Sequence, residues 1–554
     1  MPDYNIALLA RAVAEAVPDR DYFVQSSVQG FSHGNQRLTY ADMQDRARRF
    51  GRYLIDQGFE VRRERYELAN HEIGQDALGL YLHNGAEFLI ANLGCFEARV
   101  APFNINYRYV AEELTYLLHD SGARGLVYHS TFAATLAEVL KGITGPQTLI
   151  QVPDTSDNPL LPGAVWFDDA LAASDPDPGV DPTPDDLYML YTGGTTGMPK
   201  GVLWRQADVY VSALGGRNRN TGDEWPAIET VVEVAIKGGR SRVMPLPPFI
   251  HGAGQWPSLT GLLSGHTIIV PEVAERLDPA SILEAVEREA ATTLIIVGDA
   301  FARPLCNAIE GSHHDLSSIA AFINSGAALH AETKARMLDL LPGRMIIDTL
   351  GSSETGSQAR EVTTSASEAR TGSFTATETG EVVDSTRTRF AVPGEDDLGW
   401  LAQRGRLPLG YLGDADKTAL TFPVVEGERM AVAGDRAQLA TDGTVILHGR
   451  DSVTINSGGE KIFAEEVEQA LMRHPAVADV VVCGRPSERW GSEVCAVLAC
   501  HPGQDPADDD LLAEAARHIA RYKLPKVVVR CDEVYRSPSG KVDYRWAADQ
   551  VGEA

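Results

Sequence analysis

Residues 191–201 read YTGGTTGMPKG, a stretch rich in glycine and threonine that ends in Pro199, Lys200 and Gly201. Glycines let several backbone N–H groups converge on one anion, and the threonine hydroxyls and the lysine add further donors and a positive charge. The Walker pattern G-x-x-x-x-G-K-[ST] does not match, because proline precedes the lysine and glycine follows it. The stretch predicts a phosphate-binding loop of another kind, with a simple glycine-rich turn between two strands as the alternative.

The residues on either side of this loop predict its neighbours. Residues 186–192 (DLYMLYT) are apolar and aromatic, which is typical of a buried strand. Residues 202–214 (VLWRQADVYVSAL) indicate the start of a helix. A strand, an anion-binding loop and a helix form an arrangement that many phosphate sites share.

Helical and strand-like patterns alternate from about residue 37 to 450. Residues 40–58 show a helical pattern, and residues 125–130, 266–271 and 292–300 are short apolar runs. Such alternation predicts parallel α/β sheets covered by helices. The Pro- and Asp-rich residues 174–186 predict a surface linker that leads into the phosphate loop.

A change in composition at residues 448–462 (HGRDSVTINSGGEKI) predicts a Gly- and Ser-rich connector. The residues beyond it are sufficient for a small α+β domain. Its expected elements are a helix, two strands, a second helix and a final strand, at residues 464–474, 478–484, 493–500, 511–522 and 526–530. We therefore expect two domains, 1–449 and 450–554.

Composition excludes several classes of partner. The formal charge is −28 at pH 7, which opposes sequence-independent binding to nucleic acid or to an anionic membrane. The six cysteines lack metal-type spacing and are expected to be reduced, as in a cytoplasmic protein. No run reaches the roughly 18 to 20 apolar residues of a transmembrane helix, so the expected protein is soluble.

The C-terminal unit is locally basic. A solvated face is the usual meaning of such a charge run, but in a strongly acidic chain it also suggests a site for a polyanionic ligand. The residues are Arg517, Arg521, Lys523, Lys526, Arg530, Arg536, Lys541 and Arg545.

Several separate stretches, in a fixed order along the chain, resemble the motifs of adenylate-forming enzymes. This superfamily includes acyl-CoA synthetases, aryl-CoA ligases, beetle luciferases and peptide-synthetase adenylation domains. The stretches are residues 192–200, 247–256, 324–329, 350–356, 431–437 and 535–544. The resemblance implies a large ATP- and acyl-binding domain of parallel α/β sheets with a small β subdomain, followed by a small mobile α+β domain that carries the catalytic lysine and part of the CoA site.

The resemblance implies roles for the phosphate loop and for the metal. Thr192, Thr195 and Thr196 would hold the β and γ phosphates of ATP, with Gly193 in place of the usual serine. The rest of the expected nucleotide contacts in this loop are Gly194, Gly197 and Lys200. Glu354 would bind Mg²⁺, since magnesium favours one or two carboxylates together with phosphate oxygens. Ser352 and Ser353 would lie on the phosphate side.

The acid and the nucleoside have their own expected residues. His251 stands where the family has a gating aromatic or histidine, and Gly252, Trp256, Gly326 and Gly351 are the other expected substrate contacts. Gly326, Ala327 and Ala328 would cradle adenine, and Asp435 and Arg450 would contact ribose. Leu350 replaces the family's tyrosine, and an aliphatic side chain can bury the base but cannot stack on it.

The connector and the C-terminal motif complete the resemblance. Asp451 or Ser452 would be the hinge, although the family's paired acidic residues are replaced here by Ser452 and Val453. Gly458 and Gly459 would approach the pantetheine arm of CoA. Lys541 in the loop-like run YRSPSGKVDY would be the adenylation lysine.

The implied activity is an ATP-dependent acyl-CoA ligase that forms an acyl-adenylate and releases AMP and pyrophosphate. ATP, Mg²⁺ and coenzyme A would take part, the acid would be a long-chain or steroid side-chain acid, and a homodimer is a further expectation. The catalytic residues would be Lys541, Glu354, Thr195 and His251. The alternatives are an aryl-alkanoic acid CoA ligase, a ligase that loads a carrier protein, and a non-catalytic acyl-adenylate sensor. A serine esterase is excluded because G-x-S-x-G does not occur at GSSETG.

Overall fold

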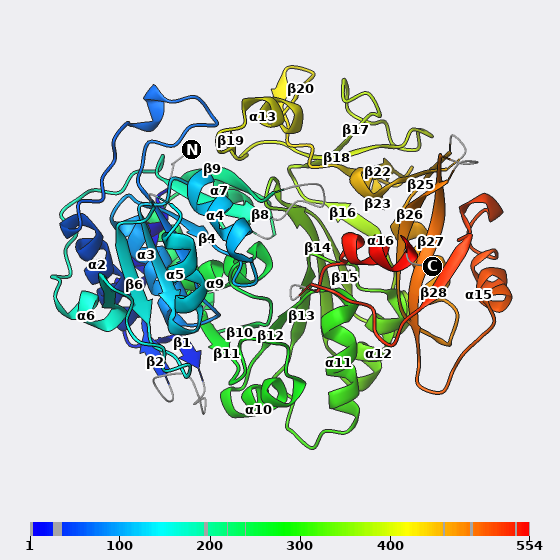
Figure 1. The fold of residues 1–554 in the computed structure, drawn as a ribbon, viewed down its shortest axis with the longest axis horizontal. Helices are drawn as coiled ribbons and strands as arrows, with labels where there is room; N and C mark the ends of the chain where they lie inside the picture. The colour runs from blue at the N-terminus through cyan, green and yellow to red at the C-terminus, as the bar shows by residue number, and fades with distance from the viewer. Residues whose placement is uncertain are drawn as a thin grey trace.

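The computed structural model describes residues 4–25, 36–143, 145–192, 198–218, 220–238, 240–457, 460–487, 491–537 and 540–552. Among them, a parallel sheet and a mixed sheet form the body of the large N-terminal domain, and a smaller five-stranded sheet forms the C-terminal domain (Figure 1). This confirms the predicted α/β class. No helix in these ranges is both long enough and apolar enough to cross a membrane.

The first sheet is wholly parallel and lies in the N-terminal third of the chain. Its order is β4 (Ala101–Asn104), β3 (Ala77–Tyr81), β5 (Gly125–His129), β6 (Thr148–Val152) and β7 (Ala164–Trp166). β3 to β6 are buried along their whole length, as expected for parallel strands covered on both faces. Helix α3 (Ala86–Glu97) is buried except at Glu87 and packs against α2 (Tyr40–Asp56).

The second sheet is mixed and carries most of the expected site residues. Its parallel part is β1 (Asp21–Gln25), β11 (Thr267–Val270), β10 (Arg242–Pro245), β12 (Thr293–Ile296), β13 (Ala321–Ser325) and β14 (Met345–Ser352), with β2 (Gln36–Thr39) antiparallel at one edge. Its antiparallel part continues through β15 (Gly356–Thr363), β16 (Ser373–Ala376), β23 (Thr444–Arg450), β22 (Asp435–Leu439), β18 (Gly399–Gln403) and β17 (Gly380–Val383). The parallel-to-antiparallel change falls at the β14–β15 hairpin, which contains Glu354.

The expected phosphate loop joins two strands. β8 (Leu187–Thr192) and β9 (Lys200–Arg205) are antiparallel, and β19 (Gly410–Tyr411) pairs with the other edge of β9. The predicted helix from residue 202 is therefore wrong for residues 202–205, and α7 begins only at Gln206 (Gln206–Ala213). A short apolar run such as VLW does not distinguish a buried strand from a helix, and here pairing with β8 decides.

The C-terminal domain agrees with its predicted element order apart from one helix. Helix α14 (Ala464–Met472) precedes β26 (Val477–Ser487) and β27 (Gly491–Cys500), and β28 (Val527–Arg530) pairs with β27. The connector is more regular than predicted, since β24 (Ile455–Ser457) and β25 (Glu460–Ile462) pair within it.

The prediction of one helix over residues 511–522 is wrong at both ends. α15 spans Asp508–Ala515, and the chain then turns so that Ile519 and Leu524 pack against the core of the domain. The last helix is α16 (Tyr544–Gly552). The segment before α16 reaches the large domain, because a Cβ at Gly540 would lie 3.0 Å from the carbonyl oxygen of Val297.

Candidate active site

The hairpin β8–β9 holds the expected phosphate loop at its tip. Thr192 and Lys200 are paired where the two strands meet the loop. The expected contacts Gly193, Gly194, Thr195, Thr196 and Gly197 lie outside the described residues. Lys200 is described: its Nζ forms an ion pair with Asp414 and lies 5.8 Å from the ring centre of Tyr411.

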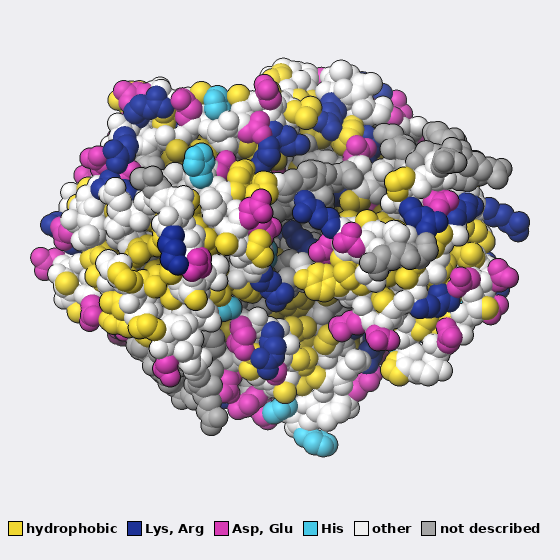
Figure 2. Space-filling view, in the orientation of Figure 1, with side chains coloured by type: hydrophobic (Ala, Val, Ile, Leu, Met, Phe, Trp, Pro, Cys, Tyr) yellow, Lys and Arg dark blue, Asp and Glu magenta, His cyan; other side chains and the backbone are white. Residues whose placement is uncertain are grey.

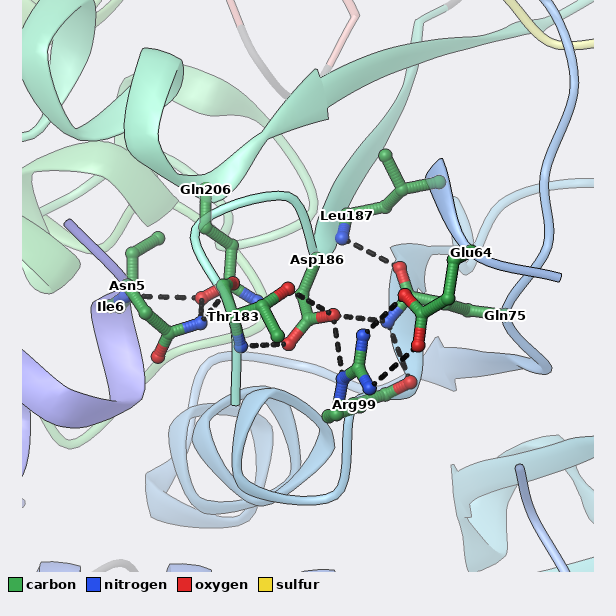
Figure 3. A network of polar contacts seen from close by, with 9 residues as sticks. All are labelled: Asn5, Ile6, Glu64, Gln75, Arg99, Thr183, Asp186, Leu187 and Gln206. Atoms are coloured by element: carbon green, nitrogen blue, oxygen red, sulfur yellow. Dashed lines mark hydrogen bonds and ion pairs between the residues drawn. The ribbon is translucent and has the colours of Figure 1, made fainter. Parts of the chain in front are cut away.

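A buried polar network fixes the other end of this hairpin (Figure 3). Asp186, directly before β8, is 2% exposed. It accepts hydrogen bonds from the Thr183 backbone N–H at 2.7 Å and from Arg99 Nε at 2.9 Å. Arg99 also bonds both oxygens of Glu64. Gln75 accepts from the Leu187 backbone N–H at 2.7 Å, which ties the first residue of β8 to the network.

The network reaches the far strand of the hairpin as well. Gln206, which follows β9, accepts hydrogen bonds at its Oε1 from Asn5 Nδ2 at 2.8 Å and from the Ile6 backbone N–H at 3.1 Å. Both ends of the hairpin base are thus held by side chains from distant parts of the chain. The linker predicted as a surface segment is solvent-exposed in part but ends in the buried Asp186.

The turn that contains Glu354 is fixed by local hydrogen bonds and by two neighbours. Ser352 Oγ accepts from the Glu354 backbone N–H at 3.2 Å. Trp204, fully buried on β9, donates from Nε1 to the carbonyl oxygen of Ser353 at 2.9 Å. The Tyr411 hydroxyl donates to Oε1 of Glu354 at 2.8 Å. A Cβ at Gly351 would lie 2.0 Å from the Gly356 carbonyl oxygen, so the hairpin itself requires glycine there.

The expected adenine segment is held by a buried chain of polar contacts. Asn324 donates to the Ala327 carbonyl at 3.0 Å and to Asp348 at 2.6 Å. Asp348 in turn pairs with Lys334, whose side chain is 1% exposed. Gly326 has a φ of +85°, a left-handed conformation that favours glycine.

Ala328 is held from the other side of the same segment. Its carbonyl accepts from the Asp299 backbone N–H at 3.3 Å, at the start of α11 (Gly298–Glu310). The Asp348 carboxyl has its pKa raised by burial, while Lys334 and Asn324 favour its ionised form. The shape of the segment therefore depends on side chains beneath it as well as on its own small residues.

Lys541 brings the C-terminal domain into this site. A Cβ at Gly326 would lie 3.8 Å from Cε of Lys541, so the lysine lies beside the adenine segment. Lys541 is exposed at the surface of the structure, although many protein atoms surround its amino group. This crowding lowers the pKa of Lys541, Arg450 lowers it further, and Glu354 and Asp435 oppose the shift.

The expected ribose contacts face each other. Arg450 at the end of β23 is paired in register with Asp435 at the start of β22, and its Nε lies 3.2 Å from Oδ1 of Asp435. The negative charge of Asp435 is the main reason that the pKa of Arg450 is raised. These two residues and Glu354 are the charges that act on Lys541.

His251 and Trp256 lie at the start of α9 (Gly252–Leu263), next to the same cleft. The pKa of His251 is lowered to about 3, first because protein surrounds the ring and then because Lys541 and Arg108 add positive charge. A Cβ at Gly252 would lie 3.4 Å from the Trp256 indole, so the indole folds back over the helix start. Trp256 Nε1 donates to the Tyr188 hydroxyl at 2.9 Å, and that hydroxyl bonds Gln255.

The expected hinge lies beside this cluster. Asp451 donates its backbone N–H to the Gly434 carbonyl at 3.0 Å and begins a single 3₁₀ turn, Asp451–Val453. The Ser452 side chain and both Gly458 and Gly459 lie outside the described residues. Arg303 of α11 bonds the Ala478 carbonyl across the two domains. At the start of the connector, Glu465 of α14 accepts from the Arg450 backbone N–H at 3.4 Å.

The structure thus brings together residues from five of the predicted motifs. His251, Gly326, Glu354, Asp435, Arg450 and Lys541 lie around one cleft. Figure 2 shows a hollow in the middle of the displayed face, with Lys and Arg side chains inside it. Much of the predicted basic surface is neutralised, since Arg517, Lys523, Arg530 and Arg536 pair with acidic neighbours.

The site fits a magnesium ion bound with a triphosphate rather than a protein-only metal cage. In the described ranges no cluster of three or more His, Cys, Asp or Glu side chains could hold a metal. Glu354 offers one carboxylate, and within those ranges its Oε2 has no hydrogen-bond or ion-pair partner. One carboxylate with phosphate oxygens and water is a usual Mg²⁺ arrangement.

Sequence reasoning missed the residues that support the cleft from behind. Tyr411, Trp204, Asn324 and Lys334 each contact a motif residue or its loop. Asn324 lies inside a recognised stretch and could have been singled out as a buried amide. Tyr411 and Trp204 gave no local signal, because their partners are 57 and 149 residues away.

Comparisons with known proteins identify the family of this chain. The family model described as "AMP-binding enzyme" matches residues 10–406, and the model described as "AMP-binding enzyme C-terminal domain" matches residues 466–541. The medium-chain acyl-CoA ligase Mig of Mycobacterium avium is 50% identical over 549 residues, covering 99% of this chain and 98% of that protein.

A second curated relative and two solved structures extend the comparison. A medium/long-chain-fatty-acid CoA/3-oxocholest-4-en-26-oate CoA ligase of Mycolicibacterium smegmatis is 38% identical over 560 residues, covering 99% of this chain and 97% of that protein. An anthranilate CoA ligase in complex with anthranoyl-AMP has a TM-score of 0.79 at 20% identity, covering 100% of this chain and 99% of that one. A fatty acyl CoA synthetase of Mycobacterium tuberculosis has a TM-score of 0.68 at 21% identity, covering 99% and 98%.

Proposed function

The chain belongs to the AMP-binding enzyme family, and from this premise we propose that it joins a long-chain or steroid side-chain carboxylic acid to CoA. It is an enzyme, an ATP-dependent acyl-CoA ligase. The observation that carries the residue-level proposal is the position of Lys541 beside Gly326, among Glu354, Asp435 and Arg450. These groups lie where a nucleotide and an acid would meet.

In the first step the carboxylate oxygen of the acid attacks the α-phosphorus of ATP. A new P–O bond forms, the bond to the β-phosphate oxygen breaks, and pyrophosphate leaves with the electron pair. The protein does little covalent chemistry in such a transfer, so positioning and charge must supply most of the rate. Lys541 would stabilise the negative charge that develops at the α-phosphate, and the loop at the tip of β8–β9 would hold the departing phosphates.

The nucleoside would be held by the residues around the cleft. Asp435 would accept hydrogen bonds from the ribose hydroxyls, and Arg450 would hold Asp435 in place through their 3.2 Å contact. The 324–328 segment would bound the adenine, with Leu350 burying one face. His251 would stay neutral across the physiological range because its pKa is about 3, so it would shape the acid site without adding charge.

Magnesium belongs to the proposal through Glu354. Bound there with the triphosphate, the ion would neutralise phosphate charge as the P–O bond breaks. Glu354 would contribute its Oε2, since Oε1 is engaged by Tyr411.

In the second step the thiolate sulfur of CoA attacks the acyl carbon of the acyl-adenylate. A C–S bond forms, the C–O bond to AMP breaks, and AMP leaves with the electrons while the thiol proton goes to solvent. Lys541 occupies the cleft in the conformation described above, so we propose that the C-terminal domain turns about Asp451 or Ser452 before this step. Gly458 and Gly459 would then border the pantetheine arm.

The substrate class rests on the relatives and on the acid side of the cleft. Relatives at 50% and 38% identity carry names that specify medium-chain, long-chain and 3-oxocholest-4-en-26-oate acids. Small residues at Gly252 and Gly326 would leave room for a bulky acid, and Trp256 would close one wall. An aryl-alkanoic acid and a carrier-protein acceptor are the alternatives. A cytoplasmic location and a homodimer complete the proposal.

A competition assay tests the substrate class. Purified protein is given ATP, Mg²⁺ and CoA with equimolar octanoic, palmitic, 3-oxocholest-4-en-26-oic and phenylpropanoic acids, and the thioesters are separated by mass. The proposal expects palmitoyl or steroid thioester to dominate. Dominance of the phenylpropanoyl or octanoyl thioester would contradict it, and acyl transfer to a phosphopantetheinylated carrier in preference to free CoA would establish the other acceptor.

A further inference from the structure

Tyr411 is placed between the phosphate hairpin and the proposed metal carboxylate. It lies on β19, where it pairs in register with Val202 of β9, two residues beyond Lys200. Its side chain is 5% exposed, and its hydroxyl donates to Oε1 of Glu354 at 2.8 Å. The backbone N–H of Tyr411 donates to Thr418 Oγ1 at 2.9 Å, which fixes the residue from the side of α13 (Ala415–Thr421).

The ring of Tyr411 faces a second charged group. Lys200 Nζ lies 5.8 Å from the ring centre and is paired with Asp414, three residues after Tyr411. One short segment therefore contacts both the lysine of the phosphate loop and the carboxylate of the adjoining turn. Lys200 and Glu354 have opposite charges, but they do not pair with each other: Lys200 pairs with Asp414, and Glu354 accepts a hydrogen bond from Tyr411.

We propose that Tyr411 is a positioning residue that orients the Glu354 carboxylate for the divalent cation that accompanies ATP. This inference rests on the proposed role of Glu354. With Oε1 engaged by the tyrosine, Oε2 is the oxygen that remains for the cation. Mg²⁺ demands near-ideal octahedral geometry, so a carboxylate held in one rotamer binds it with less ordering cost than a free one.

The backbone of the turn around Glu354 is held by other residues, so Tyr411 acts on the Glu354 side chain alone. Trp204 already holds the Ser353 carbonyl at 2.9 Å, and Ser352 already accepts from the Glu354 N–H. The turn itself is thus supported without Tyr411. Removal of the Tyr411 hydroxyl is expected to release the carboxylate while the turn stays in place.

The test compares Tyr411→Phe with a matched control, Tyr128→Phe. Tyr128 is a buried tyrosine elsewhere in the large domain, and its hydroxyl donates to Gln151 Oε1 at 2.8 Å in the N-terminal sheet. Both variants lose one buried tyrosine hydrogen bond. The probe is Mn²⁺, and its free concentration is read by electron paramagnetic resonance with ATP and without acid, so that no turnover is needed.

We expect Tyr411→Phe to raise the dissociation constant of Mn²⁺ from the protein–ATP complex about tenfold, while Tyr128→Phe leaves it unchanged. Glu354→Gln is the reference for complete loss of the carboxylate. If Glu354→Gln weakens Mn²⁺ binding and Tyr411→Phe does not, the inference is wrong and the proposed role of Glu354 stands. If Glu354→Gln leaves Mn²⁺ binding intact, the proposed role of Glu354 itself fails.

A steady-state readout separates positioning from a general structural effect. Tyr411→Phe is expected to raise the Mg²⁺ concentration for half-maximal pyrophosphate release about tenfold, with the KM for the acid unchanged. Excess Mg²⁺ should restore most of the rate. Equal loss of rate at all Mg²⁺ concentrations would overturn the inference.

Discussion

The two ends of the β8–β9 hairpin use charge in opposite ways. At the base, Asp186 is 2% exposed and accepts hydrogen bonds from Thr183 and Arg99, and Arg99 is further bound to Glu64 (Figure 3). At the tip, Lys200 is paired with Asp414, but two charged groups that lie near it are less engaged. In the described residues the Glu354 carboxylate accepts one hydrogen bond, from Tyr411, and Lys541 forms no ion pair. The polar groups at the base bind one another, whereas Glu354 and Lys541 near the tip keep donors or acceptors available for a ligand.

This difference separates residues that stabilise the fold, such as Arg99 and Asp186, from residues that are available for catalysis, such as Glu354 and Lys541. Burying paired charges is costly, and removal of one partner leaves the other buried without compensation. A group left without a partner contributes little to folding but is available for the transition state. Substitutions at the base should therefore lower the free energy of unfolding, and substitutions of the groups near the tip should lower the rate of the reaction.

The largest expected effect is at the base. Arg99→Met removes the partner of both Asp186 and Glu64, and we expect a loss of about 3 kcal/mol in the free energy of unfolding, measured by urea denaturation. The rate per folded molecule should change less than threefold. Arg52→Met, which breaks an exposed pair with Asp56, is the control and should cause no measurable loss. A lower rate in Arg99→Met with an unchanged free energy of unfolding would contradict the difference proposed between the two ends of the hairpin.

The next effect is at the tip. Lys541→Ala is expected to slow adenylation about a hundredfold or more, which is the scale for losing one strong transition-state donor. Acid-dependent exchange of pyrophosphate into ATP measures this step alone. The urea midpoint should not move. Lys237→Ala, a surface change on α8 (Ile228–Gly238), serves as control. Near-normal exchange in Lys541→Ala would refute the assignment.

The pH profile sharpens the comparison at Lys541. The pKa of this lysine in the free protein is lowered, mainly because many protein atoms surround its amino group, so its charge is lost at a lower pH than that of an ordinary lysine. The profile of kcat/KM for ATP should therefore fall on the alkaline side below pH 10.5, the usual lysine value. Lys541→Arg should move that fall to higher pH, because arginine stays protonated. An unmoved alkaline limb would assign it to another group.

The smallest expected effect concerns the wall of the acid site. Trp256→Phe removes the hydrogen bond to Tyr188 while keeping an aromatic ring over Gly252. We expect the KM for the acid to change by less than tenfold and the KM for ATP to stay the same. A change confined to ATP would place Trp256 on the nucleotide side instead.

Local sequence patterns predicted the fold class and most of the secondary-structure elements that were named from them. The alternation of helices and strands predicted the α/β fold, and the apolar run at 186–192 predicted the strand that is β8 (Leu187–Thr192). Residues 202–205 and 516–520 were assigned to helices incorrectly, because strand pairing and core packing overrode the local pattern. Both mistakes lie where a distant partner decides the structure.

The supporting side chains show the same limit more clearly. Asn5 meets Thr183 and Gln206 across 178 and 201 residues, and Trp204 meets Ser353 across 149. A single sequence carries no local signal for hydrogen bonds between residues that are so far apart in the chain. Lys541 and Glu354 could be singled out because each lies in a stretch that resembles a family motif, whereas Tyr411 is informative only when its neighbours are known.

One measurement tests the account most directly: quantification of the products of a single turnover. ATP, Mg²⁺ and palmitic acid are in excess over the protein, and CoA is first absent and then added. The account predicts that pyrophosphate forms first, at up to one equivalent per protein, while AMP stays bound as palmitoyl-AMP. Addition of CoA should then release AMP and palmitoyl-CoA in equal amounts. AMP and palmitoyl-CoA that form without prior pyrophosphate release, or a mixed acyl-phosphate with release of ADP, would contradict it.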